Sequence, residues 1–389
     1  MLLLRNPTLL RLFLAQALFW SCTLIGVTLT SLVGLQLAPL NILATLPLAL
    51  LVLGYLLTTQ PLSNFMQRRG RRAGLLLGAG AGVLGGLISA AGVWLADFGL
   101  FCLGSLILGM YQASAMYYRF AALEAVDAAH QGRATAWVVG GGLCAALLAP
   151  ELTLWARDAL ATPFTGAYLA VAALAALALP LLAGLRQGAL PPRNAGGLQA
   201  MRSLLARPTV RAAMAITAIG HGLMILVMNA TPLAMSFCGL PLATGAEVIR
   251  WHMVGMFLPA FVAGPLVDRL GARHVALLGV ALLAASSAVA LTGQQQAHFL
   301  ISSILLGMGW NLMLVAGTTL LGQGHAPEER GQAQALMELG NGAVAACASF
   351  ASGALISGLG WNPVNLAMLP LLALVLLALA GDRRQAQPA

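Results

Sequence analysis

Long runs of apolar residues, separated by short polar or basic segments, repeat along the whole chain. Each of twelve runs holds 17 to 28 residues, and an α-helix needs about 17 to 25 residues to cross a hydrocarbon core about 30 Å thick. Polar and apolar positions do not alternate within the runs, so they do not resemble the strands of a membrane barrel. The pattern predicts membrane-spanning helices at residues 9–35, 41–65, 73–95, 98–123, 134–154, 163–185, 211–238, 243–267, 274–291, 299–321, 333–359 and 364–380.

A polar segment rich in Pro and Gly, RQGALPPRNAGGLQAMRSLLARPTV, separates the sixth run from the seventh. The two halves also repeat, because SLILGMYQ resembles SILLGMGW and HQGRATAW resembles ERGQAQAL. Gly109 and Gly307 in the first pair are 198 residues apart, and Gly132 and Gly331 in the second are 199 apart. This near-constant offset indicates a duplicated six-helix unit. We predict an N-terminal bundle at 1–185, a linker at 186–210 with a short helix near LQAMRSLLA, and a C-terminal bundle at 211–389.

The composition excludes a water-soluble protein and bears on topology. Charged residues make up 8% of the chain and hydrophobic residues 60%, whereas about 25% of residues in soluble domains are charged. All 20 basic residues are arginines, and only Arg157 and Arg250 fall on one side of the predicted helices. Because cytoplasmic loops are enriched in basic residues, the other, arginine-rich side is predicted to be cytoplasmic, with both termini and the linker. The net charge of +9 therefore reflects topology in a lipid bilayer, and no nucleic-acid partner is predicted.

No motif of an enzyme or of a resident cofactor occurs. The chain has no HExxH, no GxSxG and no lysine for a Walker A loop or a Schiff base. Its five cysteines occur singly, so no disulfide framework is predicted. A GxGxxG pattern at Gly80, Gly82 and Gly85 lies inside an apolar run, where small residues allow helices to pack closely. We expect a protein that is not an enzyme.

Sulfur and imidazole side chains form two linked motifs in the seventh and eighth predicted helices. Met224 and Met228 are four residues apart, as are His252 and Met256, so each pair lies on one helix face. A hairpin centred near residue 240 would place Met228 level with His252, and Met224 level with Met256. Methionine in membrane helices is usually packing material, but neutral thioethers together with imidazole favour Cu(I). The four residues are therefore a candidate copper site near mid-membrane.

Two loops indicate a family. The segments PLSNFMQRRGRR and GPLVDRLGARH follow the second helix of each half, and both resemble the G-x-x-x-D-R-x-G-R-R loop of the major facilitator superfamily. The C-terminal copy keeps Gly264, Asp268, Arg269, Gly271 and Arg273, whereas the N-terminal copy has Ser63 and Gln67 where Gly and Asp are usual. The resemblance implies an all-α membrane protein with 12 transmembrane helices in two pseudo-symmetric six-helix bundles. Such bundles rock around a site near the bilayer midplane.

A narrower resemblance concerns cargo. Two features are similar to CcoA-type copper importers of bacterial inner membranes. One is Met-x3-Met followed by His-x3-Met, with first residues 28 apart, and the other is the segment GMYQASAMYYRFAALEA. The resemblance implies that copper is the transported substrate and that Met224, Met228, His252 and Met256 bind it. It also implies delivery to cbb3-type cytochrome oxidase assembly, with periplasmic or cytoplasmic copper chaperones as partners. Relatives without these motifs are thought to carry other cargo, including riboflavin, so the motifs and not the fold carry the copper hypothesis.

Two alternatives to copper import stay open. One is a transporter of the same fold for an organic cargo, such as riboflavin or a drug. It predicts that uptake is indifferent to the loss of Met224. The other is a membrane chaperone or sensor that binds copper without transporting it, and it predicts metal binding without flux in purified vesicles.

Four further residues are candidates for transport or coupling. Arg119 lies near the arginine-rich end of the fourth predicted helix. It is a candidate gate residue, or else an arginine that sets the topology of the helix. Glu338 lies inside the eleventh and has Val139 as its repeat counterpart, so it would carry a coupling proton or pair with an arginine. His221 shares the helix face of the two methionines. Cys238 ends the seventh helix on the outer side and could hand metal to the site.

Overall fold

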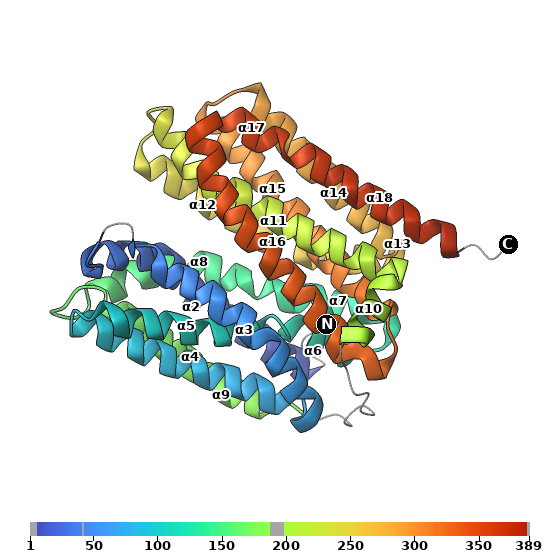
Figure 1. The fold of residues 1–389 in the computed structure, drawn as a ribbon, viewed down its shortest axis with the longest axis horizontal. Helices are drawn as coiled ribbons and strands as arrows, with labels where there is room; N and C mark the ends of the chain where they lie inside the picture. Colours follow the sequence, from blue (N-terminus) through green and yellow to red (C-terminus); the bar gives the residue numbers. More distant parts are fainter. Residues whose placement is uncertain (1–5, 41–42, 187–197, 387–389) are drawn as a thin grey trace. The chain divides into compact units, whose positions relative to one another are not determined.

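The computed structural model describes residues 6–40, 43–186 and 198–386, and within these ranges the chain is α-helical without strands (Figure 1). The helices are α2 (Pro7–Leu37), α3 (Leu46–Arg69), α4 (Arg71–Trp94), α5 (Phe98–Ala115), α6 (Tyr118–Glu124), α7 (Gln131–Gly140), α8 (Gly142–Arg157), α9 (Thr165–Ala183), α10 (Leu198–Ala206), α11 (Pro208–Phe237), α12 (Leu242–Phe257), α13 (Ala260–Leu270), α14 (Ala272–Thr292), α15 (Gln296–Gln323), α16 (Arg330–Leu359), α17 (Trp361–Leu366) and α18 (Met368–Ala386), with 3-10 turns η2 (Ala128–His130) and η3 (Pro327–Glu329).

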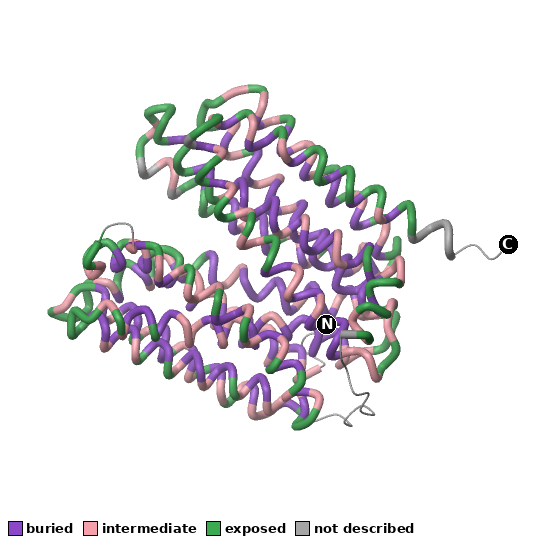
Figure 2. Tube along the Cα trace, in the orientation of Figure 1, coloured by how far each residue is buried: buried purple, intermediate pink, exposed green. Residues whose placement is uncertain are grey.

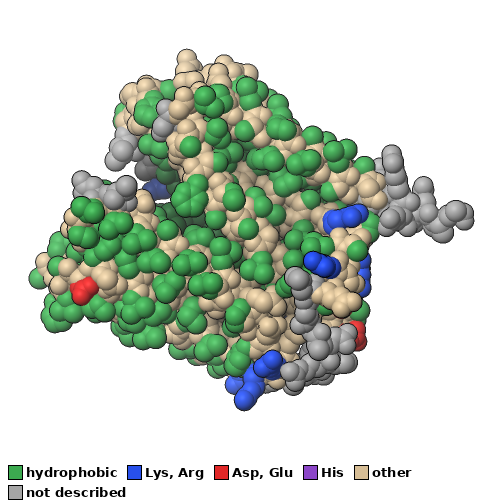
Figure 3. Space-filling view, in the orientation of Figure 1, with side chains coloured by type: hydrophobic (Ala, Val, Ile, Leu, Met, Phe, Trp, Pro, Cys, Tyr) green, Lys and Arg blue, Asp and Glu red, His purple; other side chains and the backbone are tan. Residues whose placement is uncertain are grey.

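The twelve predicted membrane helices are confirmed. The described residues contain 12 helical segments long and apolar enough to span a bilayer, and each overlaps one predicted range. The short helix predicted in the linker is α10. Large apolar side chains are exposed, among them Leu148, Trp155 and Phe350, as is common in helices whose solvent is lipid. Buried residues concentrate where helices pack on one another (Figure 2), and hydrophobic side chains are spread over the visible surface, with few charged ones (Figure 3).

Four predicted helices are broken in the structure, which apolar periodicity did not reveal. The eighth divides into α12 and α13 just before Pro259, and the twelfth divides into α17 and α18 at Ala367, three residues before Pro370. Proline removes a helical hydrogen bond and its ring clashes with the preceding turn. The fifth divides into α7 and α8 at Gly141, within a run of three glycines, and the fourth divides after Ala115.

Two compact units make up the chain. Unit 1 comprises the described residues of Met1–Ala125 and Cys144–Arg193, and unit 2 those of Val126–Leu143 and Asn194–Ala389. The predicted boundaries at 185 and 211 remain a prediction about the duplicated halves, whereas the observed contacts group α7 with the C-terminal helices. Each unit is described separately below.

In unit 1, α4 packs against α5 and α9, and α3 packs against α5. The GxGxxG pattern lies on α4 and serves this packing. A Cβ atom added to Gly82 would lie 2.5 Å from the Tyr111 ring, and one added to Gly85 would lie 2.9 Å from a backbone nitrogen of α5, whereas Gly80 faces open space. Gln67 stands near the end of α3, at the position where the family's loop usually has aspartate. In this half, Arg71 at the start of α4 forms an ion pair with Glu124.

In unit 2, α15 packs against α11, α12 and α14, while α16 packs along α11. The retained loop aspartate, Asp268 at the end of α13, holds α7 in this unit. Its Oδ1 accepts a hydrogen bond from the backbone N–H of Gly132 at 2.9 Å, and its Oδ2 lies 3.2 Å from Arg133 Nε. The ring of Trp137 meets that of Phe261 edge-on, with centroids 4.9 Å apart. Helix α15 thus forms the centre of unit 2, with the candidate site residues around it.

Candidate functional site

The four residues of the predicted copper site all belong to unit 2. Met224 lies on α11, His252 and Met256 lie on α12, and all three are buried in the protein. Met228, one turn beyond Met224 on α11, is half-buried. None of the three buried side chains faces lipid, so the sequence motifs are not a stripe on the outer surface.

His252 presents a lone pair inside the protein. Its Nδ1 lies 2.7 Å from the backbone carbonyl oxygen of Ser303 on α15. A carbonyl oxygen can only accept, so Nδ1 carries the hydrogen and Nε2 of the neutral ring carries the lone pair. His252 is only 2% exposed, and its Nε2 has no hydrogen-bond partner. A buried acceptor without a donor is costly, so this nitrogen marks a place where a donor or a metal ion would bind favourably.

Asn311 supplies a second buried acceptor along the α12–α15 seam, which is the line where these two helices pack on each other. Its Nδ2 donates to the backbone carbonyl oxygen of Met256 at 2.6 Å, and its buried Oδ1 has no partner. Ser303, Gly307 and Asn311 follow one another at intervals of four residues, so they share one face of α15. At Gly307 the helices meet closely, because an added Cβ would lie 2.7 Å from the His252 oxygen and the Met256 nitrogen.

His221 has the opposite tautomer to His252. The indole Nε1–H of Trp310 on α15 donates to His221 Nδ1 at 3.0 Å. Nδ1 therefore accepts, and the hydrogen of the neutral imidazole is on Nε2. In this state His221 Nε2 is a hydrogen-bond donor and has no lone pair for a metal. Trp310 also meets the ring of Phe257 edge-on, with centroids 6.1 Å apart.

The arrangement of α11 and α12 differs from the direct hairpin contact that the sequence suggested. Both helices pack extensively on α15 and only slightly on each other. The matched rungs of Met228 with His252 and of Met224 with Met256 remain a prediction. Sequence analysis missed α15 as the element that orients the histidines. Asn311, an amide within an apolar run, was the available signal.

The remaining candidates lie apart from this seam. Cys238, at the end of α11, is exposed and its Sγ donates to Gln294 Oε1 at 3.0 Å. It is ten residues beyond Met228, or about 15 Å along a helix. Arg119 is buried in unit 1, with its guanidinium carbon 5.0 Å from the Phe120 ring centroid. Glu338 is buried in α16 of unit 2. Among the residues that the structure describes, no three His, Cys, Asp or Glu side chains form a metal-ligand group.

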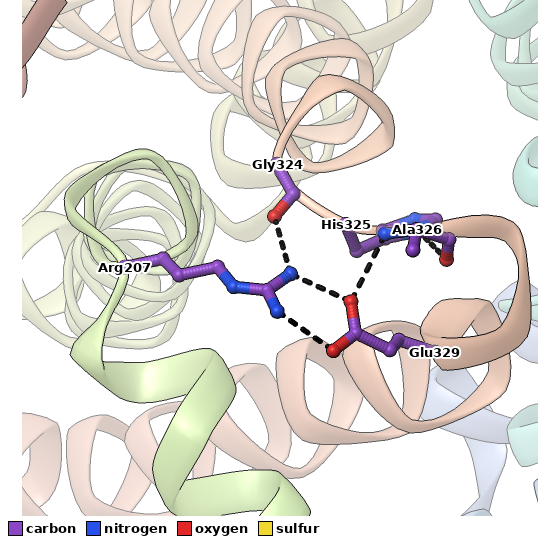
Figure 4. A network of polar contacts seen from close by, with 5 residues as sticks. All are labelled: Arg207, Gly324, His325, Ala326 and Glu329. Carbon is purple, nitrogen blue, oxygen red and sulfur yellow. Dashed lines mark hydrogen bonds and ion pairs between the residues drawn. The ribbon is translucent and has the colours of Figure 1, made fainter. Parts of the chain in front are cut away.

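A polar network fixes the arginine-rich end of unit 2 (Figure 4). Arg207, between α10 and α11, makes two hydrogen bonds to the Glu329 carboxylate at 2.6 and 2.7 Å and one to the Gly324 carbonyl at 3.3 Å. Glu329 also accepts from the backbone N–H of Ala326 at 3.0 Å. The hydrogen bonds to Glu329 raise the pKa of Arg207 above its usual value. The network ties the start of α11 to the loop between α15 and α16.

Known transporters match this chain over nearly its full length. It is 38% identical over 372 residues to the riboflavin transporter RfnT of Brucella anthropi, covering 95% of this chain and 94% of the relative. It is 28% identical over 364 residues to the uncharacterized MFS-type transporter YdeG of Bacillus subtilis, covering 88% and 84%. The sequence profile described as Major Facilitator Superfamily matches residues 246–389.

Solved structures share the fold. The transporter FucP in its outward conformation superposes with a TM-score of 0.76 at 15% identity, covering 95% of this chain and 97% of FucP. The human organic anion transporter MFSD10 gives 0.79 at 14% identity, covering 96% and 99%. At these identities the likeness concerns the fold alone.

The comparisons identify a secondary transporter and not an enzyme. They support the organic-cargo alternative better than copper, because the relative at 38% identity is named for riboflavin. The narrower resemblance to copper importers is not supported by these matches. Twelve apolar helices, the repeated loops and the full-length similarity agree: the chain belongs to the major facilitator superfamily.

Proposed function

We propose that this chain imports riboflavin or a closely related flavin across the bacterial inner membrane. The observation that carries the proposal is the 38% identity to a riboflavin transporter over 95% of this chain and 94% of that relative. Similarity along the whole length covers the cargo-binding helices of both halves as well as the scaffold. The arginine asymmetry supports cytoplasmic termini.

The polar groups along α15 suit such a cargo. Riboflavin carries hydroxyl groups on its ribityl chain and one imide N–H, and these donors match the unpartnered lone pairs of His252 Nε2 and Asn311 Oδ1. Trp310 and Phe257 add aromatic surface beside these groups.

Copper import is the second candidate, because a specific observation favours it. His252 Nδ1 donates to a backbone carbonyl and leaves the Nε2 lone pair inward, which is the usual arrangement of a metal-ligating histidine. The buried thioethers of Met224 and Met256 add soft ligands that Cu(I) prefers and that a flavin does not need. Under this candidate the metal would be delivered towards oxidase assembly, with copper chaperones as partners. A protein that binds copper without transporting it is a variant of this second candidate.

Two variants separate the cargos. Met256→Leu removes a soft ligand at nearly constant volume, which usually costs less than about 1.5 kcal/mol of stability. Asn311→Leu removes a buried acceptor and leaves the sulfur atoms in place. For a flavin transporter we expect Met256→Leu to keep riboflavin uptake within about twofold. Asn311→Leu should raise KM about five- to tenfold, since one hydrogen bond contributes roughly 1–1.5 kcal/mol.

The assay measures labelled riboflavin uptake and copper accumulation in the same cells, with membrane insertion checked by size-exclusion chromatography. The flavin proposal is overturned in favour of copper if the wild type takes up no riboflavin and Met256→Leu loses copper accumulation. Copper binding to purified protein without flux into vesicles would identify the non-transporting alternative. Uptake of neither cargo by the wild type removes both.

A further inference from the structure

A polar pair lies exposed on two membrane spans of unit 2, where α11 packs along α16. The Nδ2 of Asn229 on α11 donates a hydrogen bond to the hydroxyl oxygen of Ser349 on α16 at 3.2 Å. Both residues are exposed. Asn229 lies in the span Pro208–Phe237, eight residues before its end, which is about 12 Å along the helix. The pair is therefore open to whatever surrounds these helices at that depth.

The hydrogen-bonding capacity of this pair is only partly used. The amide of Asn229 has two N–H donors and an oxygen acceptor, and the hydroxyl of Ser349 both donates and accepts. Among the described residues, their mutual bond takes up one N–H of Asn229 and one lone pair of Ser349. A second N–H, the Asn229 Oδ1 and the Ser349 O–H are left over. In hydrocarbon these groups would be costly, so this face of unit 2 is expected to meet water or a polar ligand.

A further hydroxyl lies next to the pair on α16. Ser352 is three residues beyond Ser349, so the two share a helix face. Ser352 is only 1% exposed, and its Oγ has no hydrogen-bond partner. On α11, the hydroxyls of Thr217 and Thr231 instead donate to the backbone of their own helix. The hydroxyl of Ser352 therefore keeps its donor and its acceptor for another group.

Small residues leave space beside these side chains. Gly353 lies one turn beyond Ser349 on the same face of α16, and a Cβ atom added to it would meet no atom within 4 Å. Two turns before Asn229 the same helices are in tight contact, because a Cβ atom added to Gly222 would lie 2.5 Å from Val344. The packing of α11 on α16 is thus close at Gly222 and open at Gly353, where a ligand can reach the polar groups.

The charge of this region favours a neutral ligand. Residues 225–233 of α11 and 345–353 of α16 include no charged side chain, so a phosphate or carboxylate group would find no counterion on these two helices. An uncharged ligand that both donates and accepts hydrogen bonds fits better, and hydroxyl groups do both. The α12–α15 seam differs, because His252 Nε2 and Asn311 Oδ1 only accept. Those two acceptors suit the imide N–H of a flavin ring.

We propose that Asn229, Ser349 and Ser352 form a subsite for the hydroxyl groups of an uncharged polyol chain, which in a flavin cargo is the ribityl chain. The free N–H of Asn229 donates to a hydroxyl oxygen, and its Oδ1 accepts from a hydroxyl group. The two serines complete the set from α16. The subsite makes the transporter prefer riboflavin to lumiflavin, which has the same ring with a methyl group in place of the ribityl chain. This inference rests on the proposed function, because it assigns one part of that cargo to a place in unit 2.

Uptake kinetics in cells that express the full chain distinguish recognition of the ribityl chain from recognition of the ring. Asn229→Leu and Ser349→Ala should each raise the KM for riboflavin about five- to tenfold, since each removes a hydrogen bond to the cargo. The inhibition constant of lumiflavin, which lacks the hydroxyl groups, should stay near the wild-type value. Ser236→Ala is the matched control, because Ser236 is exposed on α11 but already donates to the Leu233 carbonyl at 2.8 Å. Its riboflavin KM should not change.

Thiol labelling tests whether the pair meets water and cargo. Asn229→Cys should react with a positively charged methanethiosulfonate reagent, which hydrocarbon excludes. Riboflavin at about ten times its KM should slow the reaction about tenfold, because an occupied site is closed to the reagent. Leu374→Cys is the control and should stay unlabelled, since Leu374 is 52% exposed on α18 among other apolar side chains. Mass spectrometry identifies the labelled position, because Cys238 and Cys347 are also exposed.

Three results would overturn the subsite while the wild type still takes up riboflavin. The first is an unchanged riboflavin KM in both variants. The second is an inhibition constant of lumiflavin that rises as much as the riboflavin KM. The third is an Asn229→Cys thiol that stays unlabelled or that riboflavin does not protect. If Asn229→Leu fails to insert, Ser349→Ala and the labelling decide. Absence of riboflavin uptake by the wild type refutes the flavin function itself.

Discussion

Helix α15 approaches α12 so closely at Gly307 that one added methyl group should uncouple the candidate site. A Cβ at Gly307 would lie 2.7 Å from the carbonyl oxygen of His252, 2.7 Å from the nitrogen of Met256 and 2.9 Å from the carbonyl carbon of Gly255. All three are backbone atoms, so no side-chain rotation relieves the contact. Because an ordinary van der Waals contact needs roughly 3.4 Å or more, Gly307→Ala must move the helices apart by about 0.7 Å.

That displacement has a calculable effect on two hydrogen bonds. The contacts from His252 Nδ1 to the Ser303 oxygen and from Asn311 Nδ2 to the Met256 oxygen are 2.7 and 2.6 Å long, and both join the same two helices. Lengthening each by about 0.7 Å weakens it substantially, at roughly 1 kcal/mol apiece. Overpacking adds about 1–3 kcal/mol, and the better helix propensity of alanine returns up to about 1 kcal/mol. The net destabilisation is about 2–4 kcal/mol.

Two measurements check this result. The apparent Tm of purified Gly307→Ala should fall by several degrees, and uptake of the cargo should drop at least tenfold in protein that still inserts. Gly245→Ala is the control, because it lies on α12 with no atom within 4 Å of the added Cβ, and it should leave both quantities unchanged or raise Tm. A Gly307→Ala protein with wild-type Tm and uptake would show that the α12–α15 seam does not position the site.

Two further predictions concern other hydrogen bonds of unit 2. Trp310→Phe keeps the aromatic ring but removes the N–H that donates to His221 Nδ1, so the KM for riboflavin should rise about fivefold, whereas copper accumulation should not change. Uptake kinetics for both cargos check this prediction, and an unaltered riboflavin KM contradicts a role for the Trp310–His221 hydrogen bond in cargo binding. Arg207→Ala and Glu329→Ala should each lower Tm by a few degrees at most, since this pair is partly exposed. A double-mutant cycle should give a coupling free energy of about 1 kcal/mol between the two residues. Fully additive effects contradict a stabilising interaction between Arg207 and Glu329.

The two proposed cargos, a flavin and copper, would both use the same stretch of unit 2, so sequence motifs alone could not distinguish them. The lone pair of His252 Nε2 serves either a hydrogen-bond donor or a soft metal ion. Under these proposals the sulfur atoms of Met224 and Met256 would serve only the metal, and the oxygen of Asn311 would serve mainly the organic donor. The same helices on a shared fold can therefore carry different cargos through a few side chains.

The sequence by itself determined where the helices long and apolar enough to span a membrane lie in this protein. Twelve spans, the linker helix α10 and the packing role of Gly82 and Gly85 follow from local properties, because span length and small-residue spacing depend only on neighbours along the chain. The duplicated loops also indicated the superfamily, because they are short contiguous motifs. The motif residues of α11 and α12 were found the same way, since a separation of four residues fixes a helix face.

Only the tertiary structure decided what those residues contact. The tautomers of His221 and His252 depend on Trp310 and Ser303, which lie 89 and 51 residues away in the sequence. An apolar helix offers several faces of similar hydropathy, so periodicity cannot choose which neighbour a face meets. The grouping of α7 with unit 2 and the burial of Glu338 arise in the same way. They are set by packing between distant segments, which no local pattern encodes.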